Sequence, residues 1–242
     1  MGVVLKVCVN GARRRHDRVP TTPVEVAASA AGAVAAGAEA VHVHPRDDDG
    51  VQTLDADLVS RTVAAVRAAV PGVPVGVSTH AGIVPDPVRR LALVAAWPAP
   101  HDGGPDFASV NWHETGATEL ARALRTRLIG VEAGLWTPSA AAAFVGTRWP
   151  WQVLRVLVEA IPGHSPGAEG PWSAGRILAA LGQQPAPVLV HGEEHWTWPV
   201  LRWAQRQGYD TRIGLEDTLH DEQGRRVEAN ADLVRPALEG RP

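Results

Sequence analysis

The sequence predicts a single compact domain, residues 1–242, with the fold of a (β/α)₈ TIM barrel. Short apolar runs alternate with longer alanine-rich amphipathic stretches, which is the pattern of parallel strands joined by crossover helices. Roughly eight such strand–helix units follow one another, and 242 residues is close to the usual length of one barrel. An open doubly wound sheet is the alternative architecture for the same alternation.

The predicted strands are short apolar runs bounded by turn residues. In chain order they are Val3–Val9, Ala40–His44, Val73–Ser78, Phe107–Asn111, Leu128–Glu132, a strand within Leu154–Glu159, Pro187–His191 and Thr211–Leu215. The stretch from Phe144 to Gly170 is rich in Trp, Pro and Gly. We therefore expect the sixth unit to be irregular.

The predicted helices are amphipathic and several begin at a residue that caps helices well. They are Pro23–Ala36, Asp55–Val70, Asp86–Ala95, Ala117–Arg125, Pro138–Phe144, Trp172–Leu181, Pro199–Gln207 and Ala229–Leu238. Thr22 is expected to cap the first, with Pro23 at the favoured first position, and Asp55 the second.

Composition excludes several classes of function. The net charge of -3 gives no electrostatic case for binding nucleic acid or an anionic membrane, and no apolar run is long enough to span a bilayer. A single cysteine, Cys8, and no signal peptide lead us to expect a cytoplasmic protein. Lys6 is the only lysine, which argues against Schiff-base chemistry, whereas ten histidines offer many metal ligands.

Nearly every predicted strand ends in a polar side chain, and in a barrel these ends meet at the rim that carries active sites. The residues are Asn10 and Arg13, then His42, His44 and Arg46, then Ser78, Thr79 and His80, then Ser109 and Asn111, then Glu132, then His191 and Glu193, and finally Arg212, Glu216 and Asp217.

His42 and His44 lie two residues apart on a strand, so both side chains face the same side. Zinc binds nitrogen and carboxylate ligands, and catalytic zinc sites typically have three protein ligands. Glu216 at the end of the eighth strand is a plausible third ligand. The alternative is that the two histidines are core residues hydrogen-bonded to neighbours.

Arg212 precedes Glu216 by four residues and is expected to face the same side. It would either bind an anionic substrate or form a structural ion pair. Asp217 reaches the same site only if the strand turns into its loop there; otherwise it is a loop or helix-cap carboxylate.

Seven segments, VHVHPRDDDG, STHAG, DFASVNWHETG, GVEAG, VLVHGEE, TRIGLEDTL and NADLV, follow one another along the whole chain. In this order they resemble the β-keto acid cleavage enzymes, a family that includes 3-keto-5-aminohexanoate cleavage enzyme. The combination of H-x-H-x-R after the second strand with R-x-G-x-E-D on the eighth is the most distinctive part of the resemblance.

The resemblance implies a zinc ion held by His42, His44 and Glu216 and a homo-oligomer. It implies that a β-keto acid and acetyl-CoA exchange parts to give acetoacetate and a new acyl-CoA. Asp217 would be the base, oriented by Arg212 and, through a water, by Ser78. The candidate substrate-binding residues are Asn10, Arg13, Arg46, Thr79, His80, Ser109, Asn111 and Glu132.

Three features depart from the family pattern. Arg13 stands where members that act on an amino-bearing substrate carry Glu, so a neutral or anionic substrate side chain is expected. His80 replaces the first glycine of the usual Ser-Thr-Gly-Gly segment, and the sixth unit, which bears on the CoA side, is shortened.

Three other functions remain as alternatives. A zinc-dependent hydrolase of the amidohydrolase kind would carry H-x-H on its first strand and often needs a bridging lysine. A metal-dependent aldolase or lyase would work without CoA. A degenerate barrel that serves as a binding protein would be expected to lack the intact set of His42, His44 and Glu216.

Overall fold

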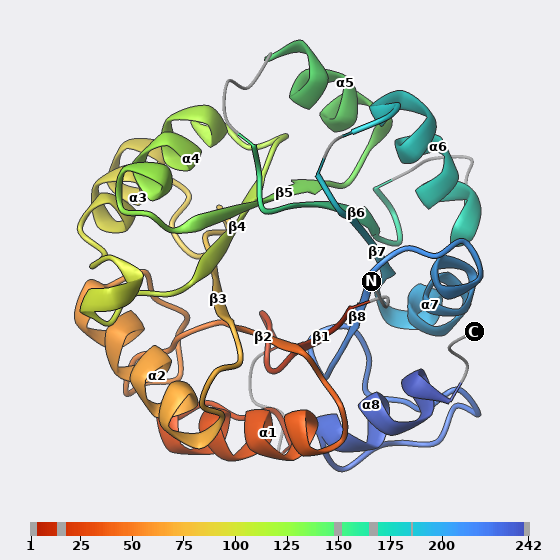
Figure 1. Ribbon diagram of the computed structural model, residues 1–242, viewed down its shortest axis with the longest axis horizontal. Helices are drawn as coiled ribbons and strands as arrows, with labels where there is room; N and C mark the ends of the chain where they lie inside the picture. The colour runs from red at the N-terminus through yellow and green to blue at the C-terminus, as the bar shows by residue number, and fades with distance from the viewer. Residues whose placement is uncertain (1–3, 14–17, 148–151, 165–168, 185, 240–242) are drawn as a thin grey trace.

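The computed structural model describes residues 4–13, 18–147, 152–164, 169–184 and 186–239. Within these ranges, eight parallel strands form a ring and eight α-helices surround it (Figure 1). The strands are β1 (Leu5–Cys8), β2 (Ala40–Val43), β3 (Val75–Ser78), β4 (Phe107–Asn111), β5 (Gly130–Leu135), β6 (Arg155–Ala160), β7 (Val188–Gly192) and β8 (Thr211–Ile213). The helices are α1 (Pro23–Ala35), α2 (Ala56–Ala69), α3 (Pro87–Ala95), α4 (Ala117–Thr126), α5 (Pro138–Gly146), α6 (Pro171–Leu181), α7 (Thr197–Arg206) and α8 (Asn230–Leu238).

The ring of strands closes between β7 and β8. The sheet has the order β7-β6-β5-β4-β3-β2-β1-β8, so β7 and β8 stand at its two ends. The Val190 N–H donates to the Asp210 carbonyl at 2.9 Å, and the Asp210 N–H donates to the Val188 carbonyl at 3.2 Å. Because these bonds join the two ends, the fold is the (β/α)₈ barrel and not the open sheet.

The fifth strand was predicted too early. We expected Leu128–Glu132, but β5 runs from Gly130 to Leu135. Leu128 has a φ of 61° and donates its N–H to the Arg125 carbonyl at 3.0 Å, so it belongs to the turn that ends α4. The shift places Glu132 inside the barrel and Trp136 directly after the strand.

The sixth strand is more regular than expected. β6 has six residues and pairs in parallel with both β5 and β7. Two other parts of this unit, residues 148–151 and 165–168, lie outside the described residues. The expected irregularity therefore does not affect the strand that reaches the barrel rim.

A buried ion-pair network fills part of the barrel interior. Lys6 Nζ lies 2.5 Å from Glu132 Oε2, and both side chains are fully buried. Arg155 approaches the same carboxylate at 3.0 Å and also lies 3.3 Å from Asp210. The ring of Phe107 lies beside Lys6, 5.5 Å from Nζ to the ring centroid. Glu132 is thus held by two cations inside the protein.

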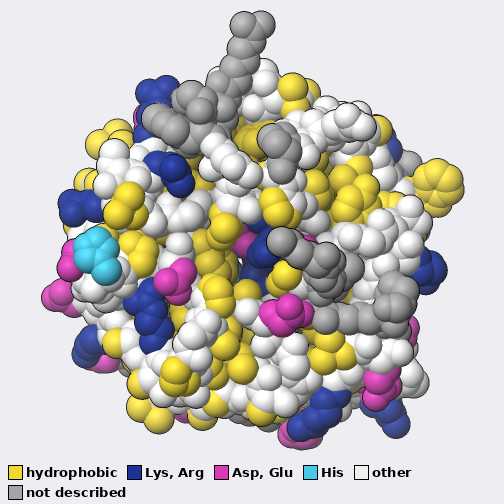
Figure 2. Space-filling model, in the orientation of Figure 1, with side chains coloured by type: hydrophobic (Ala, Val, Ile, Leu, Met, Phe, Trp, Pro, Cys, Tyr) yellow, Lys and Arg dark blue, Asp and Glu magenta, His cyan; other side chains and the backbone are white. Residues whose placement is uncertain are grey.

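The face of the molecule at one end of the barrel carries charged side chains of both signs (Figure 2). Hydrophobic side chains are scattered between them. None of the helices in the described part of the chain is long and apolar enough to cross a membrane.

Helix α1 begins with the capping arrangement that the sequence predicts. The Glu25 N–H donates to the Thr22 hydroxyl at 3.3 Å, and Glu25 Oε2 accepts the N–H groups of Thr21 and Thr22 at 3.0 Å each. These backbone bonds lower the pKa of Glu25 to about 2. The reciprocal bonds satisfy backbone donors that the first turn of a helix leaves unpaired.

We expect Glu25→Gln to lower the free energy of unfolding by about 0.5–1 kcal/mol near neutral pH, because a neutral amide accepts these bonds less strongly. The folded-state pKa lies below the ordinary value, so the advantage of the wild type is fully present above the unfolded pKa of about 4.3 and is lost as the pH falls towards 2. Urea unfolding of both proteins between about pH 7 and pH 3 measures this. A difference that stays constant with pH would contradict it.

We expect Lys6→Met to lower the free energy of unfolding by about 3 kcal/mol, because it leaves the buried Glu132 carboxylate with a single cation. Adding Glu132→Gln should recover part of the loss, since the uncompensated charge is then removed as well. Guanidinium unfolding of the single and double variants provides the comparison. If Lys6 and Glu132 were not coupled, the losses of unfolding free energy in the two single variants would add up in the double variant. Such additivity would contradict the coupling.

Candidate active site

A cavity of about 340 Å³ opens at the carboxyl ends of the strands. The predicted site residues that line it are Arg13, His42, His44, Ser78, His80, Ser109, Asn111, Arg212 and Glu216. Because these residues come from β1, β2, β3, β4, β8 and the segments that follow them, the cavity is built by the strand ends of much of the barrel.

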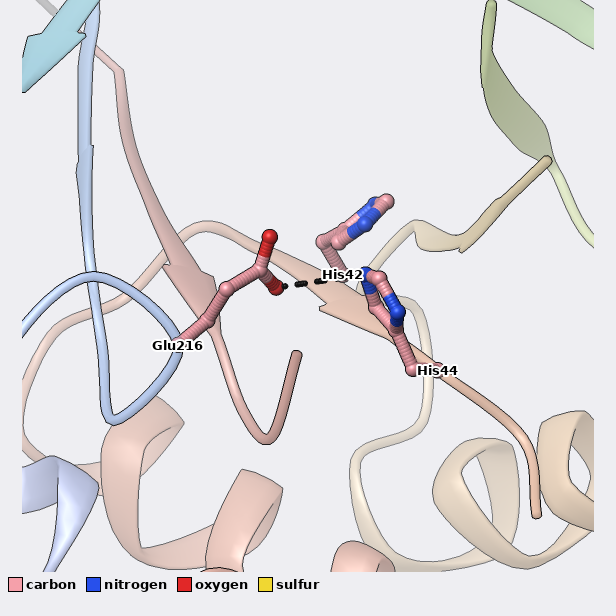
Figure 3. A group of neighbouring side chains, drawn as sticks. All are labelled: His42, His44 and Glu216. Carbon is pink, nitrogen blue, oxygen red and sulfur yellow. Dashed lines mark ion pairs between the residues drawn. The ribbon is translucent and has the colours of Figure 1, made fainter. Parts of the chain in front are cut away.

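His42, His44 and Glu216 come together at one wall of the cavity (Figure 3). One ligand atom from each lies within 4.8 Å of the others, and His44 Nε2 is 3.5 Å from Glu216 Oε2. The two imidazole rings are 5.3 Å apart between centroids and nearly perpendicular. Such a set of atoms can hold one divalent metal ion.

The hydrogen bonding of these residues fits a metal. His42 Nδ1, His44 Nε2 and Glu216 Oε2 are buried and have no hydrogen-bond partner among the described residues. His44 Nδ1, in contrast, bonds to the Gln52 side-chain oxygen. An acceptor on one ring nitrogen fixes the proton there and leaves the other nitrogen free to bind a cation.

The ionisation states also suit cation binding. Burial holds the pKa of His42 well below its ordinary value, so its imidazole is neutral and has a lone pair to donate. Burial alone would raise the pKa of Glu216, but Arg212 and His44 outweigh it and hold that pKa well below its ordinary value. The cluster therefore offers the neutral imidazole of His42, a second imidazole from His44 and one carboxylate, a donor set that Zn²⁺ accepts.

Arg212 joins Glu216 to its neighbour Asp217. Its guanidinium donates to Asp217 Oδ1 at 2.8 Å and 3.1 Å and to Glu216 Oε1 at 3.1 Å. Asp217 is fully buried, and burial raises its pKa although Arg212 favours the ionised form. β8 ends at Ile213 and the Asp217 N–H donates to the Gly214 carbonyl, so both carboxylates lie in a turn and can face one guanidinium.

His191 extends this network on the far side of Asp217. Its Nδ1 is 3.7 Å from Asp217 Oδ1, and its Nε2 bonds to Glu159 Oε2 at 3.0 Å. Burial raises the pKa of Glu159, but its bond with His191 outweighs burial and lowers the pKa overall. The result is a buried chain of polar groups from Glu159, which lines the cavity, to Asp217.

Four predicted substrate-binding residues lie outside the cavity wall: Asn10, Arg46, Thr79 and Glu132. Asn10 accepts the His44 N–H at 2.8 Å, and Arg46 donates to the carbonyls of Gly11 and Arg13 at 2.8 Å each. The Thr79 hydroxyl donates to the Ser109 carbonyl at 2.6 Å. Their bonds go to neighbouring backbone or, for Glu132, to buried cations, so we reassign them to support of the site.

Among the polar and aromatic residues of the cavity wall, Trp136, Glu159 and Glu194 were not predicted, and Glu193 was predicted only as a strand-end residue without a role. Trp136 was not predicted because the predicted fifth strand ends at Glu132, three residues before β5 ends. Glu159 lies one residue before the end of β6, the strand with the weakest sequence pattern, and Glu193 follows the seventh strand without a recognisable partner. The same strand-end rule finds all but Glu194 once the strand ends are known.

His80 packs on Trp136 at the cavity wall. The two rings are stacked, with 5.6 Å between centroids and 20° between planes. His80 Nε2 is also 3.6 Å from Glu114, a residue whose carboxylate accepts the Asn111 amide at 2.9 Å. The residue that departs from the family pattern is therefore part of the wall and does not fill the cavity.

A comparison with family models identifies the family of this chain. The family model for beta-keto acid cleavage enzymes matches residues 2–144 and 155–239. The chain belongs to this family. This membership agrees with the motifs of the sequence.

A curated member of the family shares a segment of the chain. It is the 3-keto-5-aminohexanoate cleavage enzyme of Fusobacterium nucleatum subsp. nucleatum, which is 31% identical over 90 residues. The matched segment is 37% of this chain and 33% of that enzyme, so it spans only about a third of the relative.

Solved structures share the fold at low identity. The apo structure of ObcA has a TM-score of 0.69 at 16% identity and covers 92% of this chain and 61% of that one. The complex of ObcA with oxaloacetate has a TM-score of 0.66 at 17% identity, with 92% and 63% coverage. The structure of 3-dehydroquinate dehydratase from Geobacillus kaustophilus HTA426 has a TM-score of 0.63 at 12% identity and covers 98% of this chain and 90% of that one. These likenesses show a barrel fold.

We expect Gly11→Ala to weaken metal binding at least about tenfold, because a methyl group there would lie 2.4 Å from Glu216 Cγ and displace the carboxylate. Gly11 also has a φ of 57°, a conformation that suits glycine. Competition with a chromogenic chelator for Co²⁺ or Zn²⁺ measures the affinity. Gly72→Ala is the matched control, since Gly72 has a φ of 80° but open space around it. Equal metal affinity in both variants would contradict the role of Gly11.

Proposed function

We propose that this protein uses Zn²⁺, held by His42, His44 and Glu216, to cleave a β-keto acid with acetyl-CoA as co-substrate. The products would be acetoacetate and a new acyl-CoA, which makes the enzyme an acyltransferase. The observation that carries the proposal is the cluster of three ligand atoms without a hydrogen-bond partner among the described residues, in the cavity wall of a family member.

Bound at this cluster, Zn²⁺ would supply Lewis-acid chemistry that makes the C2 hydrogens of a β-keto acid more acidic. Asp217 is the base in this proposal. Arg212 holds Asp217 Oδ1, whereas Oδ2 has no hydrogen-bond partner among the described residues and is the atom that would accept the proton.

The remaining steps exchange two acyl groups. The C2 carbanion attacks the acetyl carbonyl of acetyl-CoA, a carbon–carbon bond forms, and CoA leaves as the thiolate. The thiolate then attacks the original C3 carbonyl, and the bond between C2 and C3 breaks. The products are an acyl-CoA and the carbanion of acetoacetate, which takes its proton back from Asp217.

Ser78, Ser109 and Asn111 line the cavity on the β3 and β4 side, opposite the β8 carboxylates in the ring of strands. They supply two hydroxyl groups and an amide, which suit the carboxylate of a β-keto acid. Their part in the proposal is to orient the substrate so that C2 faces Asp217.

A cytoplasmic location and a homo-oligomeric state belong to the same proposal. The single cysteine supports the former and the family resemblance supports the latter.

We expect the purified protein to contain about one zinc per chain by elemental analysis, and His42→Ala to lose it, because a site with two protein ligands binds zinc far more weakly than one with three. His101→Ala is the matched control: it also removes an imidazole, but His101 is 68% exposed and lies outside the cavity. Zinc that is present only in traces, or that His42→Ala retains, would contradict the metal site.

We expect acetoacetate to form from a β-keto acid only when acetyl-CoA is present, and Asp217→Asn to lower kcat by about 10²-fold or more with the zinc retained. A coupled assay for acetoacetate over a panel of β-keto acids measures both. Cleavage that proceeds equally without acetyl-CoA would instead assign the chain to the aldolases or hydrolases.

A further inference from the structure

An ion pair stands at the mouth of the cavity. Arg13 Nη2 lies 2.6 Å from Glu194 Oε1, and both residues line the cavity. Arg13 also donates from Nε to the Leu215 carbonyl at 2.9 Å, and its Nη2 lies 3.4 Å from the Asp217 carbonyl. The guanidinium is therefore tied both to the segment that carries the β8 carboxylates and to Glu194.

The backbone of Glu194 is fixed in an unusual conformation. Its φ is 53°, which is uncommon for a residue other than glycine and costs conformational energy. The Glu194 N–H donates to the Asp217 carbonyl at 2.7 Å. This bond belongs to the same segment that Arg13 contacts, so one peptide group positions both partners of the ion pair.

Among the described residues, those that line the cavity beside this ion pair are apolar, engaged by a partner or uncharged. Trp136 and Leu157 are largely apolar, and the Glu159 carboxylate is engaged by His191 at 3.0 Å. Burial raises the pKa of Glu193 to about 8, so this side chain is mostly uncharged at neutral pH.

We propose that the Arg13–Glu194 pair sets the substrate class. Because each charged group is paired with the other, neither is available to a charged substrate group, and the cavity selects a β-keto acid with an uncharged side chain. A substrate carboxylate would have to displace Glu194 from Arg13, and a substrate ammonium would have to displace Arg13 from Glu194. The identity of the substrate as a β-keto acid rests on the proposed function, whereas the selection by charge rests on the ion pair.

The two partners give a reciprocal test with three 3-hydroxy acids, which lack the ketone and cannot be cleaved. They are 3-hydroxyhexanoate, 3-hydroxyadipate and 6-amino-3-hydroxyhexanoate, whose chains match except for an uncharged, anionic or cationic end. Isothermal titration of the purified protein measures each affinity. We expect the wild type to bind the uncharged acid most tightly.

Glu194→Gln is expected to raise the affinity for the anionic end, relative to the uncharged one, by about five- to tenfold, because Arg13 loses its partner. Arg13→Gln is expected to raise the relative affinity for the cationic end by a similar factor. The double variant should return to the wild-type order. Glu222→Gln is the matched control: it removes a carboxylate paired with Arg202 at 2.6 Å outside the cavity, and the ratios should not change.

Ratios that stay within about twofold of wild type in both single variants, or a wild type that prefers a charged end, would overturn the inference. Turnover of 3-oxohexanoate with acetyl-CoA by the wild type is measured separately. If the binding ratios shift as expected but no keto acid is cleaved, the selection by charge holds and the proposed function fails. Circular dichroism of each variant confirms that these partly exposed substitutions leave the fold intact.

Discussion

The guanidinium of Arg212 is the group on which the candidate active site depends. Glu216 and Asp217 are neighbours in sequence, and two ionised carboxylates so close together in a buried place would repel each other. Arg212 lies between them and bonds to both. Without this cation at least one carboxylate would take up a proton, and the site would lose one of its two ionised carboxylates.

The geometry of the turn after β8 makes this arrangement possible. Adjacent residues on a strand face opposite sides, but the strand ends at Ile213 and the chain then bends. Gly214 lies so close to the Cys8 carbonyl that a Cβ there would be 1.9 Å from the oxygen. The absence of a side chain at this one position therefore allows the turn in which Glu216 lines the cavity and Asp217 lies buried beside it, both bonded to Arg212.

Much of the fold and part of the site follow from the sequence because they depend on periodic patterns. The alternation of strands and helices predicts the barrel, and the two-residue period of a strand puts His42 and His44 on one side. The two-residue period does not indicate where a strand ends. Because the predicted fifth strand ends too early, Glu132 was expected at the rim of the barrel and Trp136 was not predicted as a site residue. The left-handed conformation of Glu194 accompanies a hydrogen bond to Asp217 in a distant segment, and no local sequence pattern indicates it.

Some polar residues that the sequence assigns to substrate binding form hydrogen bonds with the backbone instead. They show a second limit of predicting a site from the sequence. Asn10, Arg46 and Thr79 follow strands at the correct edge, yet they form hydrogen bonds with backbone groups of neighbouring segments. Residue type and position alone cannot separate a side chain that faces the cavity from one that fixes the loop around it. The difference depends on which backbone groups the tertiary structure leaves without partners.

The burial of Lys6 also determines how the protein can be handled chemically. It is the only lysine in the sequence, and its amine is fully enclosed and paired with Glu132. Reagents that react with lysine amines, such as succinimidyl esters and aldehyde crosslinkers, would find no lysine side chain on the folded surface. Modification of Lys6 would instead report that the interior of the barrel has opened, which makes this residue a built-in probe of unfolding.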